Sequence, residues 1–137
     1  MRTGLISGVL GAVLTVFLAF SATAQQAQIE GTINSQIEAF KADDFAGAFT
    51  YATPTLQMLF QSPENFKRMV TTGYPMVWRP AEVRYLELRD RGGALWQKVQ
   101  ITDGKGAVHL LDYKMEETDK GWRIAGVVIL EAPGVAA

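Results

Sequence analysis

The side chains best suited to proton chemistry in this chain are its one histidine, His109, and its four tyrosines. An imidazole titrates near neutral pH and can act as a general acid or base, and a tyrosine hydroxyl can stabilise a developing negative charge. The chain has no cysteine, which excludes a thiolate nucleophile and a disulfide framework. We predict no metal site and no cofactor, because one histidine and scattered acidic residues cannot supply a ligand set.

His109 alternates with Leu111, Tyr113 and Met115, so it lies on one face of a predicted strand together with apolar residues. Two interpretations follow. His109 and Tyr113 could be catalytic residues inside a pocket, or His109 could be a packed residue with a single hydrogen bond. Asp112 cannot orient the imidazole through the strand, because it points to the opposite face.

Aromatic residues offer a second kind of site, an apolar ligand pocket. Trp78 lies between two prolines in the segment that joins the helical half of the chain to the strands, where the rim of a pocket would be. Arg79 or Arg84 could then contact an acidic ligand. The alternative is that these aromatic residues only close the end of a small core. The pocket candidates are Tyr74, Trp78, Tyr85, His109 and Tyr113.

The first half of the chain has the apolar spacing of helices. Ile29, Ile33, Ile37 and Phe40 recur every three or four residues, which predicts a helix over 27–42. Asp43-Asp44, Thr53-Pro54 and Ser62-Pro63 are typical helix starts, because a side-chain oxygen caps the free N–H groups and proline suits the first helical position. The helix that begins after Ser62 should end near Gly73 and Pro75.

After Pro80 the apolar period changes to two, which predicts strands over 82–90, 94–102, 107–116 and 122–131. Three short glycine-containing turns join them, so they form an antiparallel meander. The last strand is apolar on both faces, which favours a central position in the sheet. Helices followed by an antiparallel sheet of about four strands define an α+β fold, with the helices packed on one face of a curved sheet.

Residues 1–24 have the features of a signal peptide. Arg2 is followed by an uncharged apolar stretch and then by small residues that end in Ala24, so we expect cleavage between Ala24 and Gln25. Retention as an anchor is the alternative, although the stretch is slightly short for a membrane span. The remaining residues, 25–137, form a single domain that would be periplasmic or secreted and would have no membrane contact once the leader is removed.

Several short segments resemble known families. Ser62-Pro63-Glu64-Asn65-Phe66, Gly73-Tyr74-Pro75, Trp78-Arg79-Pro80 and the closing run from Gly121 to Val127 resemble an uncharacterised group of exported bacterial proteins, domain-of-unknown-function family 4864. The order of elements resembles the wider nuclear-transport-factor-2-like superfamily, which includes ketosteroid isomerase and the SnoaL-like cyclases. This resemblance, over residues 28–132, implies a cone-shaped fold and no particular activity.

Two functions fit these observations. The first is an exported, non-enzymatic protein that binds a small apolar or amphipathic ligand in the cone, or another envelope protein through the outer sheet face. The second is a cofactor-free isomerase, dehydratase or cyclase that uses His109 and a pocket tyrosine. A net charge of −1 without a basic cluster argues against a nucleic-acid partner. A homodimer through the outer sheet face also fits the pattern.

Overall fold

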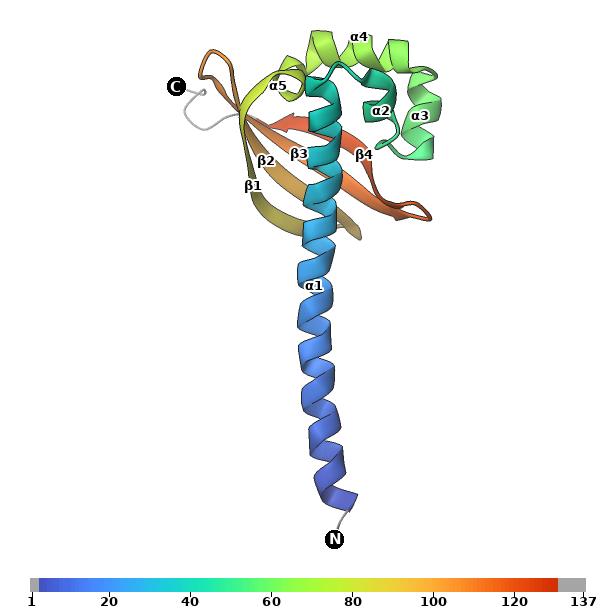
Figure 1. The fold of residues 1–137 in the computed structure, drawn as a ribbon, viewed down its shortest axis with the longest axis vertical. Helices are drawn as coiled ribbons and strands as arrows, with labels where there is room; N and C mark the ends of the chain where they lie inside the picture. The colour runs from blue at the N-terminus through green and yellow to red at the C-terminus, as the bar shows by residue number, and fades with distance from the viewer. Residues whose placement is uncertain (1–2, 131–137) are drawn as a thin grey trace.

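The computed structural model describes residues 3–130, with side chains from residue 22 onward. Five helices precede four strands, so the predicted α+β class is confirmed. The elements are α1 (Thr3–Lys41), α2 (Phe45–Phe49), α3 (Pro54–Phe60), α4 (Pro63–Gly73), α5 (Pro75–Trp78), β1 (Pro80–Arg91), β2 (Ala94–Asp103), β3 (Val108–Thr118) and β4 (Gly121–Leu130). The helices lie over one face of a curved, open sheet, and the first half of α1 extends away from the rest of the molecule (Figure 1).

Helix α1 supplies the largest apolar surface of the helical layer. Ile29, Ile33, Ile37 and Phe40 are each at most 1% exposed, so the predicted stripe faces the core. The predicted helix over 27–42 is confirmed as the end of a longer helix, which runs without a break through the expected cleavage point at Ala24. Among residues 22–130, no helix is long and apolar enough to cross a membrane.

The predicted capping residues hold the starts of the short helices. Asp44, Thr53 and Ser62 each accept a hydrogen bond from a backbone N–H three residues later, at the starts of α2, α3 and α4. The short helix α5 was not predicted. It uses the same proline rule as the others, because Pro75 occupies its first turn directly after α4 ends.

The four strands form the predicted antiparallel meander, in the order β1-β2-β3-β4. Strict alternation over 82–90 predicts Leu88 on the face opposite Val83 and Tyr85, and this prediction was wrong. A β-bulge between Tyr85 and Leu88 inserts one residue, which returns Leu88 to the core side. The buried side chain of Gln97 stabilises this bulge, because its Nε2 donates to the carbonyl oxygen of Leu86 at 2.9 Å.

The central position predicted for the last strand was also wrong, because β4 lies at an edge of the sheet. The apolar residues of β4 fall into two groups that differ in burial. Trp122 and Ile124 are buried in the core, whereas Val128 and Ile129 are partly exposed. The segment before α3 covers part of the free edge, since Ile124 exchanges backbone hydrogen bonds with Tyr51 and Thr53 at 2.8 and 2.9 Å.

Candidate ligand pocket

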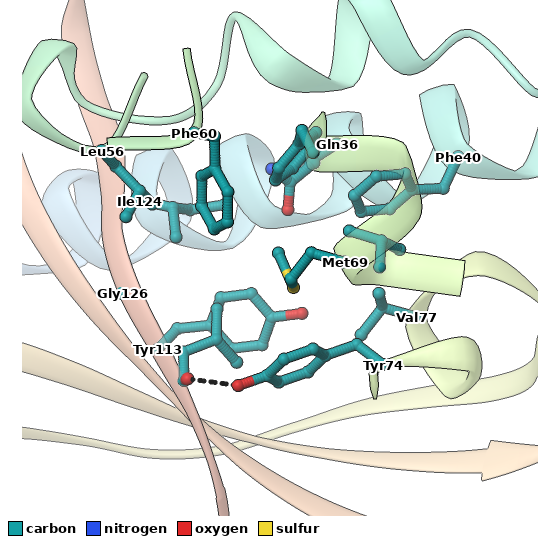
Figure 2. Close-up of a pocket in the computed structure, with 13 residues that line it drawn as sticks. Gln36, Phe40, Leu56, Phe60, Met69, Tyr74, Val77, Tyr113, Ile124 and Gly126 are labelled. Carbon is teal, nitrogen blue, oxygen red and sulfur yellow. Dashed lines mark hydrogen bonds between the residues drawn. The ribbon is translucent and has the colours of Figure 1, made fainter. Parts of the chain in front are cut away.

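A cavity of about 280 Å³ lies between the helices and the sheet (Figure 2). Its buried wall comes from α1, α4, α5, β3 and β4 and includes Phe40, Phe66, Val70, Val77 and Ile124. Its remaining wall consists of half-buried residues, among them Leu56, Phe60, Met69 and Val127. Because the half-buried residues belong to α3, α4 and β4, the cavity opens on that side. Well-packed cores contain few voids larger than a water molecule, so a space of this size is a candidate site.

Two polar groups face this apolar space from opposite sides. Gln36 of α1 is 5% exposed, and its Nε2 donates to the carbonyl oxygen of Ala48 at 3.2 Å. That bond fixes the amide, so Oε1 points into the cavity, as Figure 2 shows. The hydroxyl of Tyr113 enters the same space from β3. Neither oxygen has a hydrogen-bond partner in the described part of the chain. Both side chains are more than nine-tenths buried, so a partner for either oxygen has to enter the cavity.

Tyr113 presents a protonated hydroxyl to the cavity, and burial keeps it protonated. Its side chain is 1% exposed, and burial, assisted by the neighbouring Tyr85 and Tyr74, raises the pKa of its hydroxyl well above the usual value near 10. The phenol is therefore neutral at physiological pH and carries a proton that it can donate. Tyr113 can hydrogen-bond a ligand, but it cannot serve there as an ionised base.

Tyr74 also lines the cavity, at the junction of α4 and α5. Its hydroxyl donates to the carbonyl oxygen of Val127 at 3.0 Å, which joins the helical layer to β4 (Figure 2). Since that proton is already used, Tyr74 acts mainly as a wall of the pocket. Two of the five sequence candidates, Tyr74 and Tyr113, thus line one cavity.

Trp78 lies outside the cavity. Its indole Nε1 donates to Asp43 Oδ1 at 2.8 Å, and Arg79 Nη2 donates to the same oxygen at 2.8 Å. The Arg79 guanidinium also stacks over the Trp78 ring, 4.4 Å from its centroid. Trp78 and Arg79 therefore join the end of α1 to the start of β1. Arg79 contacts Asp43 rather than a pocket ligand, and Arg84 is not among the lining residues either.

Tyr85 and His109 also lie outside the cavity. The hydroxyl of Tyr85 donates to the carbonyl oxygen of Glu30 on α1 at 3.2 Å, and burial raises the pKa of Tyr85 to about 12. His109 Nε2 lies 2.9 Å from Asp103 Oδ2 in the β2–β3 hairpin. Asp103 accepts backbone N–H groups of that turn as well, so His109 stabilises a hairpin. The structure does not bring His109 and Tyr113 to a common pocket.

The opposite face of the sheet holds an ion cluster that the sequence did not indicate. Asp112 is on that face, as its position in the strand predicts, and is 1% exposed. It accepts from Arg89 Nη2 at 2.6 Å and from Arg91 Nη1 at 3.3 Å. Arg91 also lies over the ring of Trp96, 5.4 Å from its centroid. In the sequence Arg89 and Arg91 are only isolated basic residues, and the structure pairs both with one buried carboxylate.

Among the described residues, no group of three or more histidine, aspartate or glutamate side chains is arranged so that it could hold a metal ion. Within the cavity, the polar side chains are those of Gln36, Tyr74 and Tyr113, and all are uncharged. An arrangement of this kind can bind and orient a ligand through hydrogen bonds.

Sequence reasoning missed Gln36, although a signal was present. Ile29, Ile33, Ile37 and Phe40 define the buried stripe of α1, and Gln36 lies three residues after Ile33, within that stripe. A glutamine on the apolar face of a helix must find partners inside the protein. A glutamine within an apolar stripe therefore indicates, from the sequence, either a structural hydrogen bond or a ligand-binding side chain.

The comparisons with known proteins place the chain in one family. Residues 22–137 match a domain of unknown function (DUF4864), and the protein belongs to that family. Nothing among the curated proteins or the solved structures matches the chain.

Proposed function

We propose that this protein is exported and binds a small, largely apolar ligand in the cavity between its helices and its sheet. The observation that carries the proposal is the pair of inward-facing oxygens, Gln36 Oε1 and the Tyr113 hydroxyl, in an otherwise apolar space of about 280 Å³. Binding sites for small molecules typically combine apolar walls with a few convergent polar groups.

Two further points support the wider assignment. The family match begins at residue 22, so most of the proposed leader lies before the domain that the family shares. The helical layer over a curved antiparallel sheet is also the arrangement expected of a nuclear-transport-factor-2-like cone. We therefore propose a cleaved leader over residues 1–24 and a nuclear-transport-factor-2-like domain over 25–137, in the periplasm or outside the cell.

The geometry favours binding over catalysis. General acid–base chemistry needs a titratable group within hydrogen-bond reach of the reacting atoms. No carboxylate is among the described residues that line the cavity, and His109 is bound to Asp103 at a hairpin. Tyr113 remains as a neutral hydroxyl that can hold a ligand.

Methyl NMR tests the proposal. Met69 lines the cavity, whereas Met58 on α3 is 78% exposed and serves as an internal control in the same sample. Toluene, a small apolar probe, should saturably shift the Met69 methyl resonance and leave that of Met58 unchanged. Equal shifts at both methyl groups, or none at Met69, would contradict the proposal.

A matched pair of variants on one helix locates the binding. Leu56→Trp places a bulky ring at the cavity wall, so toluene should bind at least about tenfold more weakly. Leu59 lies on the same helix, is 74% exposed and does not line the cavity, so Leu59→Trp should bind as the unaltered protein does. Equal affinity in both variants would place the probe elsewhere.

A further inference from the structure

The polar groups of the cavity restrict the chemistry of what binds there. No lysine, arginine, histidine, aspartate or glutamate is among the thirteen lining residues. Moving a charged head group from water into such a space is strongly unfavourable, because nothing in the wall compensates for its lost hydration. The inner end of the cavity therefore selects against carboxylates and ammonium groups.

The two oxygens that face the cavity have complementary hydrogen-bonding roles. Gln36 Oε1 can only accept a hydrogen bond, because the Nε2 side of the amide is held by the carbonyl oxygen of Ala48. A ligand must bring a donor to satisfy it. The Tyr113 hydroxyl is protonated and can donate, so a ligand acceptor beside it is also satisfied. A ketone or ester offers only an acceptor, and a hydroxyl group offers both functions in one atom.

The volume limits the size of the apolar part. One water-sized group occupies about 30 Å³ in a liquid. A cavity of about 280 Å³ thus has room for roughly nine such groups.

We propose that the cavity selects a neutral alcohol of roughly nine non-hydrogen atoms, whose hydroxyl donates to Gln36 and accepts from Tyr113. This inference depends on the proposed function, because it names the ligand class of the same pocket. Its hydrocarbon part lies against the aromatic and aliphatic walls, including Phe66 and Ile124. Acids of the same length should bind more weakly, because the inner wall offers their carboxylate no counter-charge.

The first experiment compares head groups of equal chain length. 1-Octanol and octanoate are titrated by calorimetry at neutral pH, with the Met69 methyl resonance reporting the site and toluene as the apolar reference. Octanol should bind at least about tenfold more tightly than octanoate, because the ionised acid loses its hydration without gaining a counter-charge.

The second experiment removes each polar group separately. Tyr113→Phe deletes a hydroxyl that has no partner among the described residues. Gln36→Met keeps the approximate shape of the side chain. The carbonyl oxygen of Ala48 then loses the Gln36 bond but still accepts the Tyr51 N–H at 3.2 Å. Each variant should bind octanol about three- to tenfold more weakly and toluene within about twofold of the original affinity. Tyr51→Phe and Gln57→Met make the same chemical changes outside the cavity and should leave octanol binding unaltered.

The outcomes separate the two proposals. If toluene binds at Met69 but octanoate binds as tightly as octanol, or if Tyr113→Phe and Gln36→Met leave octanol affinity intact, the alcohol inference is wrong and the apolar pocket stands. If neither toluene nor octanol binds, both proposals are overturned.

Discussion

Asp112 shows what a single buried charge requires. Its carboxylate lies on the sheet face that the helices do not cover, yet it is 1% exposed, because Arg89 and Arg91 close over it. The hydrogen bond from Arg89 stabilises the ion pair and raises the pKa of the Arg89 guanidinium further. A buried carboxylate is tolerated only when such partners replace its hydration.

Asp112→Asn should therefore reduce the free energy of unfolding by about 2–4 kcal/mol, because Arg89, which is 26% exposed, loses the charge of its buried partner. Urea unfolding of the two proteins measures the difference. The exposed Asp119 provides the control, since Asp119→Asn should change stability by less than about 0.5 kcal/mol. Similar effects of both substitutions would show that the cluster contributes little.

Asp43 makes folding depend on acidity. The Trp78 hydrogen bond, followed by that of Arg79, lowers the pKa of this exposed carboxyl from its ordinary value of 3.8. The folded state thus favours the ionised form. The resulting stability is present above the unfolded pKa, near pH 4, and is lost as the pH falls through the lowered folded pKa.

Asp43→Asn should flatten the dependence of stability on pH below about 4, because the linked proton is removed. Urea midpoints between about pH 2 and 6 test this. Unchanged slopes in the variant would assign the acid sensitivity to other groups, such as Asp103, whose pKa is also lowered by its bond to His109.

At the level of elements, α3 depends strongly on its cap. It contains seven residues, none of them buried, so packing stabilises it weakly. Thr53, which is 2% exposed, accepts from the Leu56 N–H at 3.2 Å and fixes the helix start beside the cavity.

Thr53→Ala should destabilise the protein by about 0.5–2 kcal/mol through loss of this cap. Thr53→Ser keeps the capping hydroxyl and should retain most of the stability. Urea unfolding measures both. Thr55→Ala, on the exposed side of the same turn, should have an effect below about 0.5 kcal/mol. A loss in Thr55→Ala as large as in Thr53→Ala would refute the capping role.

For the whole molecule, the core begins well after the proposed leader. Among the described side chains, Ile29 is the first buried residue, and the first half of α1 extends away from the sheet (Figure 1). None of the described side chains from Ala22 to Ala24 is buried, although Ala22 and Ala24 line a surface hollow together with Glu117 and Trp122.

A chain that starts at Gln25 should unfold at the same urea concentration, within error, as the full-length chain, because the packed core is complete in both. Mass spectrometry of the protein from its own cells should also find a mature N-terminus at Gln25. A full-length mass in the exported fraction would contradict the leader, and a destabilised shorter chain would show that residues before Gln25 support the fold.

The sequence determined those features that depend on local spacing. The stripe of isoleucines on α1, the three capping residues and the alternating strands each follow from rules that act over a few residues, and the structure confirms them. The α+β class follows from their order along the chain.

The register of β1 and the composition of the pocket depend on the tertiary structure. A bulge of one residue moved Leu88 to the core side, and residues far apart in sequence, such as Gln36 and Tyr113, reached one cavity. Trp78 and His109 found partners in Asp43 and Asp103 instead. Side-chain partners depend on how the helical layer and the sheet pack together. Local periodicity does not show which residues that are far apart in sequence lie close together in space.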